Sequence, residues 1–206
     1  MWLIVMQKNL NGYILKKIIR SICVKVISVV LKIEPYILTL IGEAKLDSIK
    51  SREIGARLYG NGTVLAPDKL KLGKHVQVGK SYYFACHGGI SIGDYSHLSR
   101  NVTIYSRNHD INSGALPYDD NFILKKVEIG RYVWIGMNVN ILPGVKIGDG
   151  AVIGMGTTVA KDVGRGEVVV GSPYRVIGER NISCESKNLE LGRFWGKNKL
   201  ILDEDD

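Results

Sequence analysis

Large apolar residues recur every six positions through the middle of the chain, between about residues 58 and 160. An α-helix repeats every 3.6 residues and a plain strand every two, so neither explains a step of six. Six residues can hold a short strand and a sharp turn, and three such units complete a coil of roughly 18 residues. The residues at this step are Leu72, Val78, Phe84, Ile92, Leu98, Ile104, Ile129, Ile135, Ile141, Ile147, Ile153 and Val159.

Glycine directly follows seven of these twelve apolar positions. We attribute these glycines to the unusual backbone angles that a sharp turn requires. Together with the period, they predict a mainly β fold: a parallel β-solenoid of about five coils, with sheets on three sides and the apolar residues stacked inside. The glycines are Gly73, Gly79, Gly93, Gly130, Gly136, Gly148 and Gly154.

Two insertions interrupt the repeat. The shorter one lies near Cys86, His87 and Gly88, and the longer one spans about residues 106–126. Both follow the third strand of successive coils, so we expect them to project from the same edge. Insertions between repeats emerge as loops and are where such proteins most often carry their function.

Residues 1–45 form a separate N-terminal segment that is both apolar and basic. Its apolar residues recur at spacings of three and four, which predicts a basic amphipathic helix, and no acidic residue precedes Glu34. Its uncharged runs fall short of the roughly 18–20 residues of a membrane span. We expect Pro35 to end or kink the helix. The helix either packs on its own domain or a neighbouring subunit, or lies at an anionic membrane surface.

Composition sets the remaining bounds. The 206 residues are 45% apolar and 23% charged, which is typical of a globular protein and excludes disorder for most of the chain. The three cysteines, Cys23, Cys86 and Cys184, form no paired framework, so a reducing compartment is expected. The net charge of +8 favours an anionic partner without identifying it.

The run from Val127 to Val163, followed by Val170–Ile177, resembles the hexapeptide-repeat acyltransferases. Within that superfamily it resembles the O-acetyltransferases of sugars and surface polysaccharides, including the maltose and galactoside acetyltransferases. The resemblance covers about residues 58–178, which we take as the acyltransferase domain. It implies a left-handed parallel β-helix, acetyl-CoA as donor, and a homotrimer with active sites between subunits.

The resemblance assigns the catalytic base to His109, because the family carries its catalytic histidine on a loop that leaves the helix at this point. Imidazole titrates near neutral pH, so it suits the removal of a proton from an attacking hydroxyl. We expect direct attack on the thioester without an acyl-enzyme.

Matching the family's cofactor positions one by one gives a candidate groove for acetyl-CoA. It comprises a tryptophan near the thiol end, two residues beside the pantetheine arm, and a pair and an arginine near the nucleotide. The matched residues are Trp134, Met137, Met155, Ala160, Lys161 and Arg175.

The acceptor side is less defined by the resemblance. Cys86 and His87 are candidates because they share an edge with the catalytic loop, and Asp110 and Tyr118 are candidates by position within that loop. We expect no metal, because the histidine spacing departs from the three-histidine pattern of the zinc carbonic anhydrases that share this architecture. His75 and His97 are interpreted as turn residues.

The sequence therefore predicts an acetyl-CoA-dependent O-acetyltransferase acting on a sugar hydroxyl, such as that of a surface-polysaccharide unit. Acetylation of an antibiotic hydroxyl, transfer to an amino sugar and an inactive trimeric scaffold stay open as alternatives. We expect a cytoplasmic protein, with peripheral contact at the membrane's inner face through its helix, and no nucleic-acid partner. The C-terminal tail, residues 179–206, has no functional interpretation.

Overall fold

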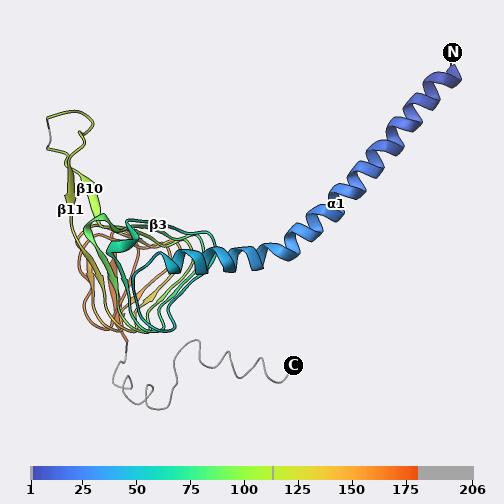
Figure 1. Ribbon diagram of the computed structural model, residues 1–206. Coiled ribbons are helices and arrows are strands. Elements are labelled where there is room, and N and C mark those ends of the chain that lie inside the picture. The colour runs from blue at the N-terminus through green and yellow to red at the C-terminus, as the bar shows by residue number, and fades with distance from the viewer. Residues whose placement is uncertain (1, 113, 181–206) are drawn as a thin grey trace, which may run out of the picture. The chain divides into compact units, whose positions relative to one another are not determined.

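The computed structural model describes residues 2–112 and 114–180, and the tail beyond residue 180 lies outside them. The chain divides into two compact units, residues 1–39 and the residues from Leu40 onward. The helix α1 (Trp2–Asp47) occupies the first unit and extends into the second. The rest of the second unit is a three-sided solenoid of short parallel strands (Figure 1).

Three parallel sheets form the sides of the solenoid. The first sheet contains β1 (Ser51–Arg52), β4 (Leu70–Leu72), β7 (Ile90–Ile92), β12 (Val127–Ile129) and β15 (Lys146–Ile147). The second contains β2 (Arg57–Leu58), β5 (Gln77–Val78), β8 (His97–Leu98), β13 (Trp134–Ile135), β16 (Val152–Ile153) and β18 (Glu167–Val170), with β19 (Arg175–Glu179) antiparallel beside β18. The third contains β3 (Thr63–Leu65), β6 (Tyr83–Ala85), β9 (Thr103–Tyr105), β14 (Asn140–Ile141) and β17 (Thr158–Val159).

The apolar residues at the six-residue step form the core of the solenoid. All twelve residues at that step are buried, with at most 3% of their surface exposed. The strand register stacks them in columns, for example Leu72 on Ile92 in the first sheet and Phe84 on Ile104 in the third. The predicted solenoid of about five coils is therefore confirmed: five coils have strands on all three sides, and β18 begins a sixth.

The glycines that follow the core residues have a different cause from the one we expected. A Cβ on Gly73 would lie 2.3 Å from Asp94 Oδ1, and a Cβ on Gly136 would lie 2.7 Å from the Met155 nitrogen. The left-handed backbone lies two residues further on, at Tyr95 (φ 59°) and Tyr132 (φ 58°). The prediction that these glycines serve unusual backbone angles was therefore wrong, because they are required by the close approach of the next coil.

The corner between the first and second sheets repeats most regularly. His75, with φ 54°, is a turn residue as predicted, and its ring stacks on Tyr95 at a centroid distance of 5.2 Å. Tyr95 in turn stacks on Tyr132 at 5.3 Å. Further along this corner, Asp149 accepts hydrogen bonds from the Arg131 amide at 2.8 Å and from its guanidinium. Side chains therefore link successive coils at this corner.

The first coil begins upstream of the region where the period is evident. Strand β1 pairs in register with β4, and Arg52 occupies the column position opposite Leu72. Arg52 is exposed and forms an ion pair with Asp47 at 2.8 Å. Because β1 is the edge strand of its sheet, its column position need not be apolar. Arg52 at that position interrupts the apolar pattern, so the first coil could not be recognised in the sequence.

Pro35 was expected to end or to kink the helix; α1 continues through it to Asp47, so it does not end the helix. Apolar side chains are exposed on more than one side of its described part. Ile22 and Val29 are exposed on the predicted apolar face, and Val24, Ile27 and Leu31 are exposed among the cations. Within the part of the chain that is described, no helix combines the length and apolarity needed to cross a membrane.

Candidate active site

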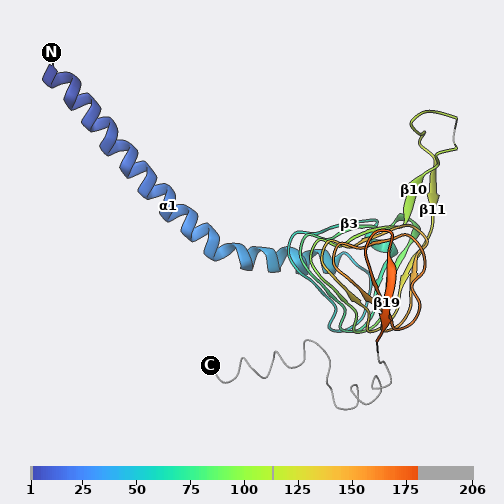
Figure 2. The ribbon, with the colours of Figure 1, turned by 180° about the vertical axis from the view of Figure 1, so that it is seen from behind.

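The longer insertion forms a β-hairpin that rises from the corner between the third and first sheets (Figures 1 and 2). It consists of β10 (Arg107–His109) and β11 (Phe122–Leu124), paired antiparallel. Arg107 faces Leu124, and His109 faces Phe122. Because side chains alternate along a strand, these four residues share one face of the hairpin.

The two insertions lie on the same edge, as predicted. The short helix η2 (Cys86–Gly88) follows β6, and the hairpin follows β9 in the next coil. A third irregular turn, η1 (Pro67–Lys69), follows β3 and packs against η2. Three successive coils therefore depart from the repeat at one place, where surface for recognition is created.

Ser106 fastens the hairpin to the solenoid. It is fully buried, its hydroxyl donates to the Ala85 carbonyl at 2.7 Å, and it accepts from the Gly88 amide at 2.9 Å. Its own carbonyl accepts from the Lys125 amide at 2.9 Å, at the point where the chain returns. The base of the hairpin is thus fixed by hydrogen bonds to the preceding coil and between its own two ends.

His109 lies between two aromatic rings near the tip of the hairpin. The Tyr118 ring stacks on it at 3.7 Å, and the Phe122 ring lies at 4.3 Å on a tilted plane. Its Nδ1 lies 3.3 Å from the carbonyl oxygen of Asp119. A carbonyl oxygen only accepts, so this contact places the proton on Nδ1 and leaves Nε2 as the basic nitrogen.

The remaining loop candidates shape the tip. The Asp110 amide donates to the Asn121 carbonyl at 3.1 Å, and its carboxylate accepts from the Asn112 amide at 2.9 Å. Asp110 is therefore held in a local turn, whereas Tyr118 contacts the histidine directly. Arg107 lies over the Phe122 ring at 4.6 Å and braces the same face.

Cys86 and His87 occupy different environments although they are adjacent in sequence. Cys86 is fully buried, and burial raises the pKa of its thiol to about 12, with a smaller contribution from Asp68. We expected the Cys86 side chain to face the acceptor. It packs into the core instead, as the buried residue of η2. His87 is half-buried, and its buried Nδ1 has no hydrogen-bond partner in the described structure. Burial, then Arg107 and Lys69, lower the pKa of His87, against an opposing effect of Asp68.

Trp134 lies on the outer face of the second sheet, with 55% of its surface exposed. Its register partners are His97 in β8 and Val152 in β16. His97 is therefore a strand residue and not the turn residue we predicted, and burial lowers its pKa. Because it lies beside Trp134, His97 is a further candidate that the sequence analysis missed. Its place directly before the column residue Leu98 is the signal that could have identified it as a strand residue.

Met137 and Met155 lie one coil apart at the corner between the second and third sheets. Met155 is 65% exposed, and Met137 is half-buried with its sulfur 3.2 Å from Arg100 Nε. Gly136 brings the two coils into backbone contact at this corner. The pair therefore places two flexible thioether side chains at this corner, one exposed and one half-buried.

The nucleotide-end candidates gather near the last complete coil. Ala160 and Lys161 are exposed, and the Lys161 ammonium lies 5.1 Å from the centre of the Tyr174 ring. The Tyr174 hydroxyl donates to the Asp162 carbonyl. Arg175 begins β19 and is exposed. These residues offer cations at the surface of this coil.

A single chain does not bring all the candidates together. The hairpin leaves the corner between the third and first sheets, whereas Trp134 belongs to the second sheet, on the opposite side of the prism. Among the described residues, the recorded ring contacts of His109 are within its own hairpin. The structure therefore places the two groups of candidate residues on different sides of one chain.

Comparisons with known proteins agree with this architecture. The profile described as "Bacterial transferase hexapeptide (six repeats)" matches residues 126–161. Galactoside O-acetyltransferase of Escherichia coli is 33% identical over 136 residues, which cover 63% of this chain and 66% of that protein. The matched region spans between 46% and 66% of the length of this and the next two curated relatives.

Two solved structures extend the likeness to three dimensions. The maltose O-acetyltransferase of Clostridium difficile is 33% identical, with a TM-score of 0.56, covering 64% of this chain and 68% of that one. A galactoside acetyltransferase in complex with coenzyme A is 26% identical, with a TM-score of 0.53, covering 71% and 82%.

The repeated coils define the chain as a hexapeptide-repeat β-solenoid. It belongs to the hexapeptide-repeat acetyltransferase family, and its relatives include acetyltransferases of the galactoside and maltose kind.

Proposed function

We propose that this protein is an acetyl-CoA-dependent O-acetyltransferase that acetylates a sugar hydroxyl, such as one of a surface-polysaccharide unit. The observation that carries the proposal is His109 on its hairpin, held in the tautomer that a general base needs. Relatives named as galactoside and maltose O-acetyltransferases, and one seen with coenzyme A, support the donor and the reaction class.

In this proposal Nε2 of His109 removes the proton of the acceptor hydroxyl as its oxygen attacks the thioester carbonyl. The Asp119 carbonyl keeps the proton on Nδ1 and stabilises the imidazolium that forms. The C–S bond then breaks, and the His109 imidazolium gives its proton to the leaving sulfur, so that coenzyme A leaves as the thiol. Tyr118 and Phe122 fix the plane of the His109 ring, so the ring loses little orientational freedom when the acceptor binds.

Acetyl-CoA would bind along Trp134, Met137 and Met155, with its nucleotide phosphates near Lys161 and Arg175. Exposed apolar side chains suit the pantetheine arm, and the cations suit phosphate. Ala160 leaves room beside Lys161 for the nucleotide. The reaction requires no metal in this scheme, because His109 supplies the base.

We further propose a homotrimer in which one copy supplies the hairpin and its neighbour supplies the groove. The separation of His109 and Trp134 on opposite sides of one chain supports this arrangement, since transfer requires base and thioester to meet. Closed cyclic symmetry would then create three equivalent sites.

The test is thiol release from acetyl-CoA against sugars, sugar phosphates, amino sugars, oligosaccharides and antibiotics. We expect release with one glycan class, and a decrease in kcat on the order of 10²–10⁴ for His109→Ala. Ile123→Ala, exposed on the other face of β11, is the matched control and should stay within a few-fold of wild type. Release with an antibiotic alone, or no binding of acetyl-CoA, would contradict the proposal.

Shared sites can be tested by complementation. His109→Ala and Trp134→Ala should each be nearly inactive, but co-expressed chains should recover activity, because mixed trimers contain interfaces with both intact residues. Recovery should depend on mixing the chains before assembly. No recovery in verified mixed trimers would place the whole site within one copy.

We propose that the helix α1 lies at an anionic membrane surface on the cytoplasmic side, where acetyl-CoA is available. Between residues 16 and 33 it carries five cations and no acidic residue, and its apolar side chains, including Ile22, Val26 and Val29, are largely exposed. Each basic residue near such a surface contributes about 1 kcal/mol.

Co-sedimentation with vesicles tests the membrane proposal. Binding to vesicles rich in anionic lipid should exceed binding to neutral vesicles, and Lys25→Glu together with Lys32→Glu should abolish most of it. Lys74→Glu, on the solenoid, is the matched control. Equal binding to both vesicle types would contradict the proposal, and dissociation of the oligomer by the helix substitutions would instead assign the helix to a neighbouring subunit.

A further inference from the structure

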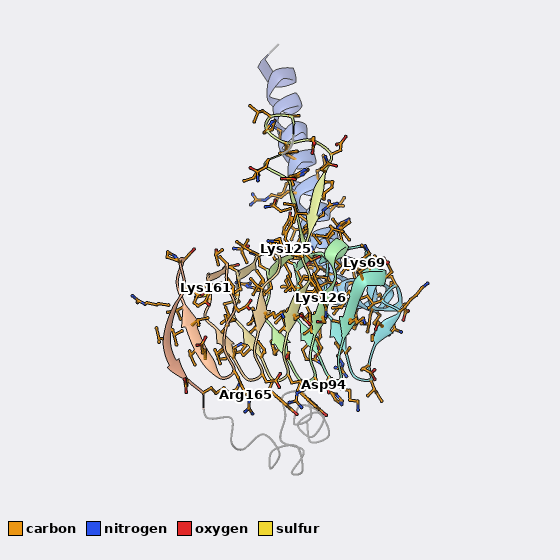
Figure 3. All side chains as sticks on the ribbon, turned by 90° about the vertical axis from the view of Figure 1, so that its left-hand side faces the viewer. Lys69, Asp94, Lys125, Lys126, Lys161 and Arg165 are labelled. Atoms are coloured by element: carbon orange, nitrogen blue, oxygen red, sulfur yellow. The ribbon has the colours of Figure 1, made fainter. Side chains whose placement is uncertain are left out.

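A basic depression lies at the foot of the catalytic hairpin. It encloses about 460 Å³ and opens to solvent on the edge from which the hairpin rises. Side chains from four elements line it: Asp68 and Lys69 of η1, Lys71 of β4, His87 of η2, and Leu124 and Lys126 at the return of the hairpin. Figure 3 shows Lys69, Lys125 and Lys126 near the hairpin base, and Asp94 and Arg165 along another edge.

The cations of this depression retain capacity for a ligand. Lys69 donates to the His87 carbonyl at 2.8 Å, which uses one of its three donors. Lys126 pairs with Glu128 at 2.7 Å, but both side chains are about half exposed, so the pair is weak and exchangeable. Lys71 forms no ion pair within the described residues. Asp68 is the single acidic group among the lining residues, against three lysines.

The depression and His109 lie on the same face of the hairpin. Leu124 lines the depression, and it is the register partner of Arg107, whereas His109 pairs with Phe122. Two residues along an antiparallel strand span about 7 Å, so the base stands roughly that far above the depression. One molecule can therefore place a charged group in the depression and a hydroxyl at His109.

We infer that the acceptor carries an anionic group, a phosphate or a carboxylate, which Lys69, Lys71 and Lys126 hold while the hydroxyl meets His109. This inference rests on the proposed function and narrows its acceptor to an acidic glycan or sugar phosphate. Such a subsite would orient the acceptor and decide which hydroxyl reacts, because the charge fixes one end of the molecule.

His87 reports binding independently of catalysis. Its ring lines the depression, with Lys69, Arg107 and Asp68 as the charged groups that affect its titration, and Lys71 and Lys126 in the same lining. An anion bound among these groups favours the imidazolium, so the His87 pKa should rise when galactose 6-phosphate or inorganic phosphate is added. The imidazole resonances, assigned with His87→Gln, measure this in the full-length protein.

The decisive experiment compares three matched acceptors: galactose 6-phosphate, galacturonic acid and methyl galactoside. We expect at least one anionic acceptor to exceed the neutral one in kcat/KM, and the better of the two identifies phosphate or carboxylate. Each of Lys69→Ala and Lys126→Ala should reduce that preference about three- to tenfold and remove the rise of the His87 pKa. Lys74→Ala, on the far edge beside Asp94, is the matched control.

The outcomes separate this inference from the proposed function. Equal or faster transfer to the neutral sugar overturns the anionic acceptor and leaves the acetyltransferase in place. An unchanged His87 pKa with both anions overturns it whatever the transfer assay gives. A His87 response without binding of acetyl-CoA supports the anion site and overturns the proposed function instead.

Discussion

Two corners of the same solenoid follow opposite rules. At the corner between the first and second sheets, every coil turns in the same way, and rings and carboxylates join one coil to the next. At the corner between the third and first sheets, three coils turn differently, and one releases a hairpin. The repeat therefore supplies stability at one corner and is suspended at another, where the candidate base and a basic depression are found.

The largest contrast between core and hairpin comes from two phenylalanines. Phe84 is fully buried in its column, so Phe84→Ala should lower the free energy of unfolding by about 3–5 kcal/mol. Phe122→Ala on the exposed hairpin should change stability by less than about 1 kcal/mol but reduce turnover, because the His109 ring loses a support. Chemical denaturation and the transfer assay measure both. Equal destabilisation would show that the hairpin is part of the folding core.

Glycine substitutions repeat the contrast on a smaller scale. Gly136→Ala would place a Cβ 2.7 Å from the Met155 nitrogen, so the coils must separate, at a cost of about 1–3 kcal/mol. Gly114→Ala has open space and should be neutral within about 0.5 kcal/mol. The melting temperatures of the two variants provide the check, and a neutral Gly136→Ala would mean that coil spacing is adjustable.

Ser106→Ala tests how the hairpin is attached to the solenoid. The change leaves the Gly88 amide without its acceptor, which should cost about 1–2 kcal/mol. Hydrogen exchange should rise at Gly88 and Lys125 in particular. Ser91→Ala, half-buried on the outer side of β7, should be near neutral. Uniform loosening throughout the solenoid would contradict a local role.

The smallest expected effect is the pH-dependent stabilisation by Asp149 at the regular corner between the first and second sheets. Burial alone would raise the pKa of Asp149, but the Arg131 amide and guanidinium lower it overall. A lowered carboxyl pKa stabilises the folded state fully above the unfolded value of about 3.9, and this stabilisation is lost as the pH falls through the folded value. Asp149→Asn should therefore cost less than about 1 kcal/mol at pH 7, with the difference closing below about pH 4. A gap that persists in acid would exclude the charge as its cause.

The sequence predicted the regular part of the molecule and the position of its interruption. The core columns could be predicted because one aliphatic residue at a fixed step is all that stacking requires. The hairpin could not, since its strands are short and largely exposed, and the hydrogen bonds of Ser106 that join its two ends leave no periodic signal. His97 was misread as a turn residue because the turn lies at Tyr95, two positions earlier.

The way Ser106 closes the base of the hairpin has a consequence for the changes that this segment can tolerate. The chain leaves and re-enters the solenoid beside one buried hydroxyl, so the segment between behaves as an exchangeable cassette. Insertions, deletions and replacements within it need not disturb the coils on either side. A changed segment can therefore present different side chains at this edge while the coils of the scaffold keep their packing.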